Sequence, residues 1–407
     1  MKKLRIAQIA PLVERVPPKK YGGTERVVYH LTEGLVAKGH EVTLFASGDS
    51  VTSARLIAPI SESLRLGRKT HSATIVTMMM LSKVYEEMLH EFDIIHSHLE
   101  YLTLPYAHKV RVPTVLTMHG RLDIGEYGKM LGLYPHMAYV SISDSQRFPV
   151  EEINWVKTIY HGYPPSGFEF NDMPEDYFLY LGRFSEEKRP EQAIMLAKAC
   201  NIPLKIAAKI DPTDQDFFDN KIRPMLDHPL IDYVGEVDES RKVALLKNAK
   251  ALLNTIDWPE PFGLVMIEAL ACGTPVIVRG CGSAPEVISH GKTGYICQTR
   301  LDFINAIRNT DKLSRKTCRE EFERRFSADT MVNNYEELYY DLLQKNSFPE
   351  ATHSKDAQRS SGLMQLRRSG VSAEPEADCC RLLFDDAMYI NDRNQRNCFW
   401  SKTGIMK

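Results

Sequence analysis

Residues 260–277 read Glu-Pro-Phe-Gly-Leu-Val-Met-Ile-Glu-Ala-Leu-Ala-Cys-Gly-Thr-Pro-Val-Ile, and this stretch decides the fold. Pro261 and Gly263 predict a tight turn that exposes the backbone. The apolar residues that follow recur at helical spacing until Gly273, which predicts the end of the helix. Residues 276–278 then have the apolar pattern of a short buried strand. The stretch therefore predicts a turn, a helix and a strand, which are the repeating elements of an α/β protein.

Two carboxylates mark this stretch. We expect Glu260 just before the helix and Glu268 about two turns inside the same helix, close to the same face, because eight residues at about 100° each return near the starting direction. A helix N-terminus with unpaired N–H groups binds anions. Carboxylates on both sides of an anion site suit a ligand with central phosphates and hydroxyls at its ends, such as a nucleotide sugar. The alternative interpretation is a capping carboxylate and a solvated surface glutamate.

The complete pattern, E-P-F-G-x-x-x-x-E-A-x-A-x-G-x-P-V, resembles the signature of the retaining glycosyltransferases of family four (glycosyl transferases group 1), which have the GT-B fold. The resemblance extends over about residues 4–344. It implies an α/β protein in which two Rossmann-like domains face each other across a cleft. We expect an acceptor domain over residues 1–165, a nucleotide-sugar donor domain over 166–326, a helix over 327–345 that crosses back to the first domain, and a tail over 346–407.

Length and composition are compatible with this assignment. The 407 residues exceed the roughly 250–300 at which single cores stop growing, so two domains are expected. A net charge of −2 gives no reason to expect nucleic acid as a partner. The eight cysteines show no ligand-like spacing, which favours buried thiols in a reducing compartment. No segment approaches the ~20 apolar residues of a membrane span. We expect a cytoplasmic protein, with any membrane contact peripheral and at the inner membrane face.

The N-terminal segment predicts a Rossmann-type half unit. A strand over residues 4–10, a Gly-Gly loop, an apolar helix and a second strand follow one another, and ligands bind at the carboxyl end of such a strand. Thr24 is the predicted helix N-cap. The Gly-Gly pair alone is also typical of an ordinary turn. The resemblance places this loop beside the donor phosphates and the acceptor, which implies donor binding by Gly22 and Gly23 and acceptor binding by Glu25.

Histidines stand at the carboxyl ends of two predicted strands, where side chains point into the cleft of an α/β sheet. His96 and His98 end the first strand and His119 follows the second. A metal site built from all three is an alternative, but no carboxylate cluster accompanies them. The resemblance implies that His119 contacts the donor sugar and the acceptor, and that His98 lies on the acceptor side; a core histidine is the alternative for His98. Tyr127 lies on a glycine-rich segment, read either as a mobile acceptor loop or as a surface excursion.

Cations lie between a strand and a helix in the second half. Arg183 and Lys188 belong to Gly-Arg-Phe-Ser-Glu-Glu-Lys, and arginine forks onto paired phosphate oxygens while lysine adds a point charge. The alternative is a solvated turn in which the two glutamates neutralise the cations. The family motif G-R-x-x-x-x-K assigns both cations to the donor diphosphate. Glu236, in Val-Gly-Glu-Val, resembles a position in the loop that holds the nucleotide base through its backbone.

The resemblance implies a retaining hexosyltransferase that moves a sugar from a nucleotide sugar, with UDP-glucose slightly favoured, to an unknown glycan, lipid or small-molecule acceptor. Glu268 would hold the ribose and Glu260 the sugar hydroxyls. The N–H groups of Phe262, Gly263 and Leu264, together with the two cations, would stabilise the leaving diphosphate, so neither a cofactor nor a metal is expected. The predicted catalytic residues are His119, Glu260, Arg183 and Lys188.

Two other functions are compatible with the same motifs. One is a nucleotide-sugar epimerase on the same fold, which needs additional acid and base carboxylates in the cleft. The other is a non-catalytic protein that binds nucleotide sugars. Beyond residue 346 the sequence is polar, without the family's pattern, which predicts a disordered or loosely attached tail. A segment that binds a partner or a membrane surface is the alternative for this tail.

Overall fold

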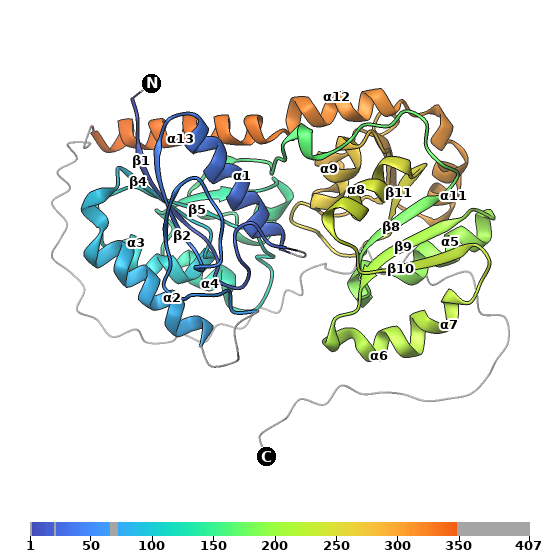
Figure 1. The fold of residues 1–407 in the computed structure, drawn as a ribbon, viewed down its shortest axis with the longest axis horizontal. Helices are drawn as coiled ribbons and strands as arrows, with labels where there is room; N and C mark the ends of the chain where they lie inside the picture. The colour runs from blue at the N-terminus through green and yellow to red at the C-terminus, as the bar shows by residue number, and fades with distance from the viewer. Residues whose placement is uncertain (1, 20–21, 66–71, 348–407) are drawn as a thin grey trace, which may run out of the picture. The chain divides into compact units, whose positions relative to one another are not determined.

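Two parallel β-sheets form the framework of the protein (Figure 1). The computed structural model describes residues 2–19, 22–65 and 72–347, so the predicted tail lies outside the described residues. The first sheet has the strand order β3-β2-β1-β4-β5-β6-β7 and the second β10-β9-β8-β11-β12-β13. The strands are β1 (Arg5–Ile9), β2 (Glu41–Phe45), β3 (Arg55–Ile57), β4 (Ile94–Ser97), β5 (Thr114–Thr117), β6 (Ala138–Ser141), β7 (Trp155–Thr158), β8 (Phe178–Arg183), β9 (Leu204–Lys209), β10 (Ile231–Gly235), β11 (Ala251–Asn254), β12 (Val276–Arg279) and β13 (Gly294–Cys297).

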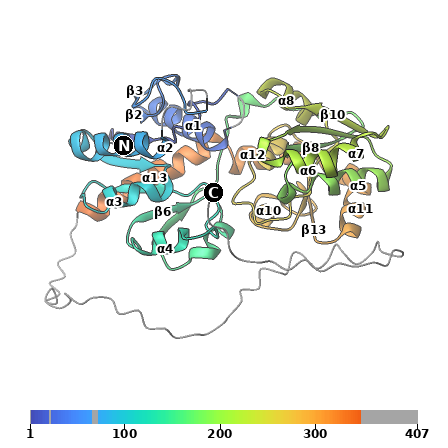
Figure 2. The same cartoon turned by 90° about the horizontal axis from the view of Figure 1, so that it is seen from below.

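Helices alternate with the strands, which confirms the predicted Rossmann-like α/β architecture in both halves. In the second half, α9 packs against α8 and α12, while α5 packs against α11; Figure 2 gives a second view of this half. The boundary expected at residues 165 and 166 stays a prediction. The α-helices are α1 (Gly23–Ala37), α2 (Ala73–Ser82), α3 (Leu104–Ala107), α4 (Tyr127–Gly132), α5 (Pro190–Cys200), α6 (Gln215–Phe217), α7 (Arg223–Leu226), α8 (Glu239–Asn248), α9 (Leu264–Ala271), α10 (Ala284–Val287), α11 (Arg300–Arg308), α12 (Arg315–Arg325) and α13 (Ala328–Ser347).

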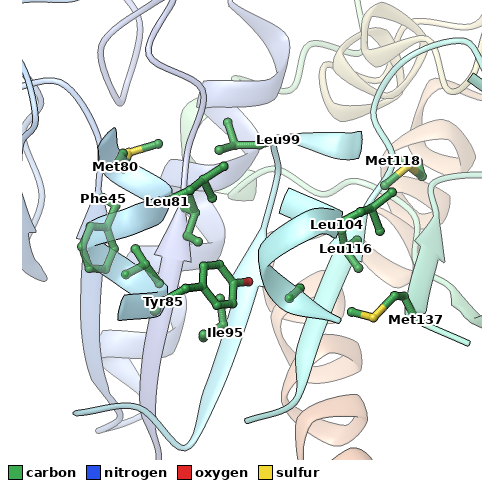
Figure 3. Close-up of a cluster of buried hydrophobic side chains, with 14 of the residues drawn as sticks. Phe45, Met80, Leu81, Tyr85, Ile95, Leu99, Leu104, Leu116, Met118 and Met137 are labelled. Atoms are coloured by element: carbon green, nitrogen blue, oxygen red, sulfur yellow. The ribbon is translucent and has the colours of Figure 1, made fainter. Parts of the chain in front are cut away.

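A large apolar core lies under α2 in the first half (Figure 3). Met80 and Leu81 of α2 are buried with Phe45 of β2, Ile95 of β4 and Leu116 of β5. The sequence analysis assigned no element to the segment of α2, because a short run with almost no polar residues lacks the periodicity that reveals an amphipathic helix. Among the described residues, no helix has the length and apolar character needed to cross a membrane.

Helix α13, the last one within the described residues, packs on the first sheet's half of the chain (Figure 1). Its side chains Met331, Val332, Tyr335 and Tyr339 are buried in one cluster with residues of α1, β1 and β4. Helix α1 comes close to α13 at Gly34, where a Cβ atom would lie 2.5 Å from a methyl group of Val332. The C-terminal helix is therefore part of the first half's core.

Two local predictions were wrong. Helix α1 begins at Gly23, with Gly22 as its N-cap and no capping side chain, so Thr24 lies inside the first turn instead of capping it. Helix α9 begins at Leu264, where its apolar pattern starts, directly after Gly263 with a φ of +77° that is rare for residues with a side chain, so Glu268 lies about one turn inside the helix instead of the expected two. Glu260 thus precedes the helix by a full turn, and Glu260 and Glu268 do not share a helix face.

Candidate active site

A cavity of about 610 Å³ collects residues from the carboxyl ends of both sheets. Its volume falls within the range of roughly 300–1,000 Å³ that is usual for small-ligand sites. Loops after β1, β5 and β7 line it from the first half, and loops after β8, β10 and β11 from the second. The predicted residues that line it are Gly22, Gly23, Glu25, His119, Arg183, Lys188, Glu236, Glu260, Phe262, Gly263, Leu264 and Glu268.

The two glycine motifs, although far apart in the sequence, meet at this cavity. A Cβ atom on Gly23 would lie 2.8 Å from Cδ1 of Leu264, so the start of α1 and the start of α9 are in direct contact. No side chain caps either helix. Both helices therefore direct uncapped N-termini, which carry partial positive charge, at the same space.

Carboxylates hold both predicted phosphate-binding cations. Lys188 Nζ lies 2.5 Å from Oε2 of Glu260. The guanidinium of Arg183 lies 3.2 Å from Glu187 and 3.8 Å from Asp214. A bound diphosphate would compete with these carboxylates for the cations, because phosphate and carboxylate accept the same charge-assisted hydrogen bonds.

Asp214 also belongs to an Asp-Gln-Asp triplet, residues 214–216, that the sequence analysis overlooked. Its carboxylate faces Arg183. Within the part of the chain that the structure describes, no group of three metal-binding side chains comes together. The expectation of metal-independent chemistry stays a prediction.

A series of side chains with alternating charge connects Glu268 in the second half of the protein to α1 in the first half. Lys242 Nζ lies 2.6 Å from Glu268 and 3.0 Å from Glu239. Glu239 in turn lies 2.9 Å from Arg26 of α1. Arg26, Glu239 and Lys242 were not predicted from the sequence, although Arg26 directly follows the Gly-Gly-Thr-Glu loop. Lys242 carried no comparable signal, since a lysine on a polar helix is usually solvated.

The three sequence-predicted histidines lie close together, with His96 and His98 buried and His119 half-buried at the cavity. His119 Nε2 lies 2.9 Å from His98 Nδ1, and His98 Nε2 lies 2.9 Å from Oε1 of Gln8. His96 contacts the hydroxyls of Tyr339 and Thr117 through its two ring nitrogens, at 2.7 Å each. Because these nitrogens bond to protein groups, the three rings do not form a metal-ligand set. Burial lowers the pKa of His119 to about 3, so the ring is neutral at physiological pH.

His161 also lines the cavity and was not among the residues predicted from the sequence. Its ring stacks on that of His119 with centroids 5.2 Å apart and meets Phe262 edge-on at 5.0 Å. Burial also lowers the pKa of His161 well below its usual value. The signal that identified His119, a histidine just after a parallel strand, applies equally to His161, which follows β7.

Two predicted acceptor residues lie outside the set that lines the cavity. His98 is behind His119 and only 2% exposed. Tyr127 donates a hydrogen bond to Glu100, whose other carboxylate oxygen accepts one from the N–H of Gly120. His98 thus contacts His119 directly, and Tyr127 is linked to Gly120 through Glu100; the roles of both residues in acceptor binding stay predictions.

Comparison with known proteins identifies the family. The family model described as glycosyl transferases group 1 matches residues 168–327, and the model described as glycosyltransferase family 4 matches residues 21–155. This chain is a family-four glycosyltransferase. An uncharacterized glycosyltransferase of Methanocaldococcus jannaschii is 25% identical over 332 residues, which cover 70% of this chain and 84% of that protein.

Solved structures share the GT-B fold with this glycosyltransferase. Sucrose-phosphate synthase from Thermosynechococcus elongatus has a TM-score of 0.66 at 19% identity, covering 84% of this chain and 100% of that one. Anabaena HepE in complex with UDP-glucose has a TM-score of 0.64 at 14% identity, covering 83% and 100%. The predicted GT-B fold is thereby confirmed.

Polar contacts also join the two halves of this glycosyltransferase. The carboxylate of Glu286 accepts hydrogen bonds from the N–H groups of Asp144 and Ser145, both at 2.8 Å, and from the hydroxyl of Tyr160 at 3.2 Å. Together with the pair of Arg26 and Glu239, these contacts span from the first sheet's loops to the second's. Such contacts break and re-form at lower cost than a large apolar interface, which suits a cleft that opens and closes.

The buried carboxyl of Glu25 makes the free energy of unfolding depend on pH. Burial raises the pKa of its carboxyl from 4.5 to about 7, against the smaller lowering effects of backbone N–H groups and Arg65. The folded state therefore keeps this proton to a higher pH than the unfolded state, and the free energy of unfolding falls as pH rises from about 4.5 to 7. We expect Glu25→Gln to raise stability by on the order of 3 kcal/mol at pH 8 and by little at pH 5.

Urea unfolding of both proteins at the two pH values measures this difference. Glu41→Gln, at an exposed glutamate paired with Lys3 on the surface, is the matched control and should show no comparable pH dependence. An equal stability gain for Glu25→Gln at pH 5 and pH 8 would contradict the raised pKa.

Proposed function

We propose that the protein transfers a sugar from a nucleotide sugar to an acceptor hydroxyl with retention of anomeric configuration. The observation that carries this proposal is the convergence of the two cations, two carboxylates and the uncapped start of α9 with His119 in one cavity. In this proposal the diphosphate takes the place of the carboxylates on Arg183 and Lys188. Glu268 holds the ribose hydroxyls and the loop of Glu236 holds the base.

The leaving group is the nucleoside diphosphate. Negative charge grows on its oxygens as the bond to the anomeric carbon breaks and that carbon becomes oxocarbenium-like. Arg183 and Lys188 face this charge with fixed cations, and the N–H groups around Gly263 add the partial charge of the helix N-terminus. Glu260, freed from Lys188, is positioned for the sugar hydroxyls.

Retention follows in this proposal if the acceptor attacks from the face that the diphosphate leaves. The acceptor oxygen forms a bond to the anomeric carbon while the bond from that carbon to the phosphate oxygen breaks. The acceptor's proton passes to the departing phosphate, so no protein base is required. Closure of the cleft brings His119 and Glu260 toward the same sugar, and domain motion therefore gates turnover.

UDP-glucose is the slightly favoured donor. Anabaena HepE, whose fold is similar, is known in complex with UDP-glucose, and this supports the choice. Incubation with UDP-, GDP- and ADP-sugars and a panel of hydroxyl acceptors tests the proposal through mass detection of a glycosylated product. The anomeric proton coupling of that product, compared with the donor's, reports retention.

The same experiment separates the two rival functions. Release of a nucleoside diphosphate together with a glycosylated product supports transfer. A changed sugar on an intact donor supports an epimerase. Saturable donor binding without any change in the sugar supports a non-catalytic binding protein. An inverted anomeric configuration in the product would contradict the proposed retaining step.

A further inference from the structure

A series of buried hydrogen bonds leads from α13 to the cavity through Gln8 of β1. The amide nitrogen of Gln8 donates to the hydroxyl of Tyr339 at 3.1 Å, and its amide oxygen faces Nε2 of His98 at 2.9 Å. The hydroxyl of Tyr339 also lies 2.7 Å from His96 Nδ1. All four side chains are at most 2% exposed, so bulk water does not replace any of these bonds.

The amide of Gln8 determines which ring nitrogen of His98, and in turn of His119, carries the proton. An amide oxygen only accepts hydrogen bonds, so the proton of neutral His98 is on Nε2. His98 Nδ1 is then a lone-pair acceptor, and the group 2.9 Å away, Nε2 of His119, must donate to it. His119 is neutral at physiological pH because burial lowers its pKa, so its single ring proton is on Nε2.

The remaining nitrogen of His119, Nδ1, therefore carries a lone pair. This atom is buried and has no hydrogen-bond partner within residues 2–19, 22–65 and 72–347, and its residue lines the cavity. An unpaired buried acceptor is costly, so a ligand group that donates to it gains affinity. A phosphate oxygen, itself an acceptor, does not fit this nitrogen, whereas a sugar hydroxyl does.

We propose that Gln8 is a positioning residue that sets the tautomer of His119 through His98, so that His119 Nδ1 accepts a hydrogen bond from a hydroxyl of the transferred sugar. This inference rests on the proposed function for the identity of the ligand, but the tautomer itself is a property of the free protein. It also links the cavity to α13, since Tyr339 holds the amide nitrogen of Gln8 and thereby keeps the amide oxygen on His98.

The tautomer can be measured without any substrate. Nitrogen-15 NMR of histidine-labelled protein distinguishes a protonated ring nitrogen from one with a lone pair, and His119→Asn identifies the signals of His119. We expect a single tautomer, protonated at Nε2, in the ligand-free protein. Gln8→Met removes both amide groups and should give averaged shifts, while Gln8→Glu, which keeps an acceptor toward His98, should restore the Nε2–H form.

Tyr85→Phe is the matched control, because it removes a buried hydrogen bond to Thr114 in the same half without touching the series. We expect Tyr85→Phe to lower the free energy of unfolding about as much as Gln8→Met does. The His119 signals should nevertheless stay unchanged. With UDP-glucose as donor, we expect Gln8→Met to lower kcat/KM by about 3- to 10-fold, the worth of one neutral hydrogen bond, and Gln8→Glu to recover part of it.

Each outcome bears on one claim. A proton on Nδ1 of His119 in the unaltered protein would overturn the assigned tautomer, and an unchanged tautomer in Gln8→Met would overturn the role of Gln8. If the expected tautomers are seen but no nucleotide sugar is cleaved, the proposed function fails while the positioning role of Gln8 stands.

Discussion

Lys188→Met should reduce the rate of donor cleavage by about 10²- to 10³-fold, the loss typical for one group that stabilises charge in a transition state. Lys188 is the cation whose partner, Glu260, also faces the cavity. Its replacement removes the positive charge that faces the leaving diphosphate. It also leaves Glu260 without its counter-ion. The measurement is single-turnover release of nucleoside diphosphate from UDP-glucose at saturating donor.

A lysine outside the cavity provides the control for this prediction. Lys221 is half exposed; its ammonium makes a long ion pair with Glu191 at 3.7 Å and lies over the ring of Phe217. Lys221→Met removes the same charge from the same half of the chain and should retain nearly full activity. Equal losses in the two variants would show that net charge, and not the position of Lys188, matters. An unaffected rate in Lys188→Met would remove this lysine from the catalytic machinery.

We expect Gly282→Ala to lower activity by displacing the backbone of Glu260. Gly282 has a φ of +57°, and a Cβ atom there would lie 2.5 Å from the nitrogen and 2.6 Å from the oxygen of Glu260. Backbone atoms cannot rotate away as a side chain can, so the loop that carries Glu260 must shift. We expect a loss of at least about 100-fold in activity, since a displacement of about 1 Å in a reacting geometry has that effect.

The Gly291→Ala variant is the control that distinguishes this steric effect from backbone strain. Its φ is +76°, but no atom lies within 4 Å of a Cβ built there. Gly291→Ala should therefore cost about 1 kcal/mol of stability, from the left-handed backbone alone, and leave activity intact. Thermal unfolding and donor cleavage are measured for both variants. A Gly282→Ala protein with the activity of Gly291→Ala would show that the Glu260 loop tolerates the shift.

Much of the fold could be predicted because its signals are local. Alternation of apolar strands and amphipathic helices predicted both parallel sheets, and motifs after strands predicted which loops face the cleft. Helix α2 could not be found in this way, because a short, largely apolar run with few polar residues shows no clear period. The start of α9 followed from its apolar pattern, but the shared face expected for Glu260 and Glu268 was wrong, because the turn that ends in the left-handed Gly263 does not continue the helical spacing.

The site was predicted where a residue lies inside a motif and was missed where its role comes from a distant partner. Lys188 and Glu260 were each recognised, but their pairing across 72 residues appears only in the fold. Lys242 and Arg26 become site residues because α8 and α1 bring them to Glu268 and Glu239. Gln8 has no sequence signal of any kind, because its role depends on its hydrogen bond to His98, which is 90 residues away in the sequence.

The central claim is that this cleft binds a nucleotide sugar through its cations. A thermal-shift screen with UDP, GDP, ADP and their sugar conjugates tests it most directly, because a ligand that binds the native state raises its stability by mass action. Arg183→Ala is compared with Arg223→Ala, which removes an exposed arginine that contacts its helical neighbours Asp219 and Phe218 and does not line the cavity. We predict that one nucleotide class stabilises the unaltered protein and Arg223→Ala but not Arg183→Ala. A folded protein that shows no shift with any of these nucleotides would contradict the account.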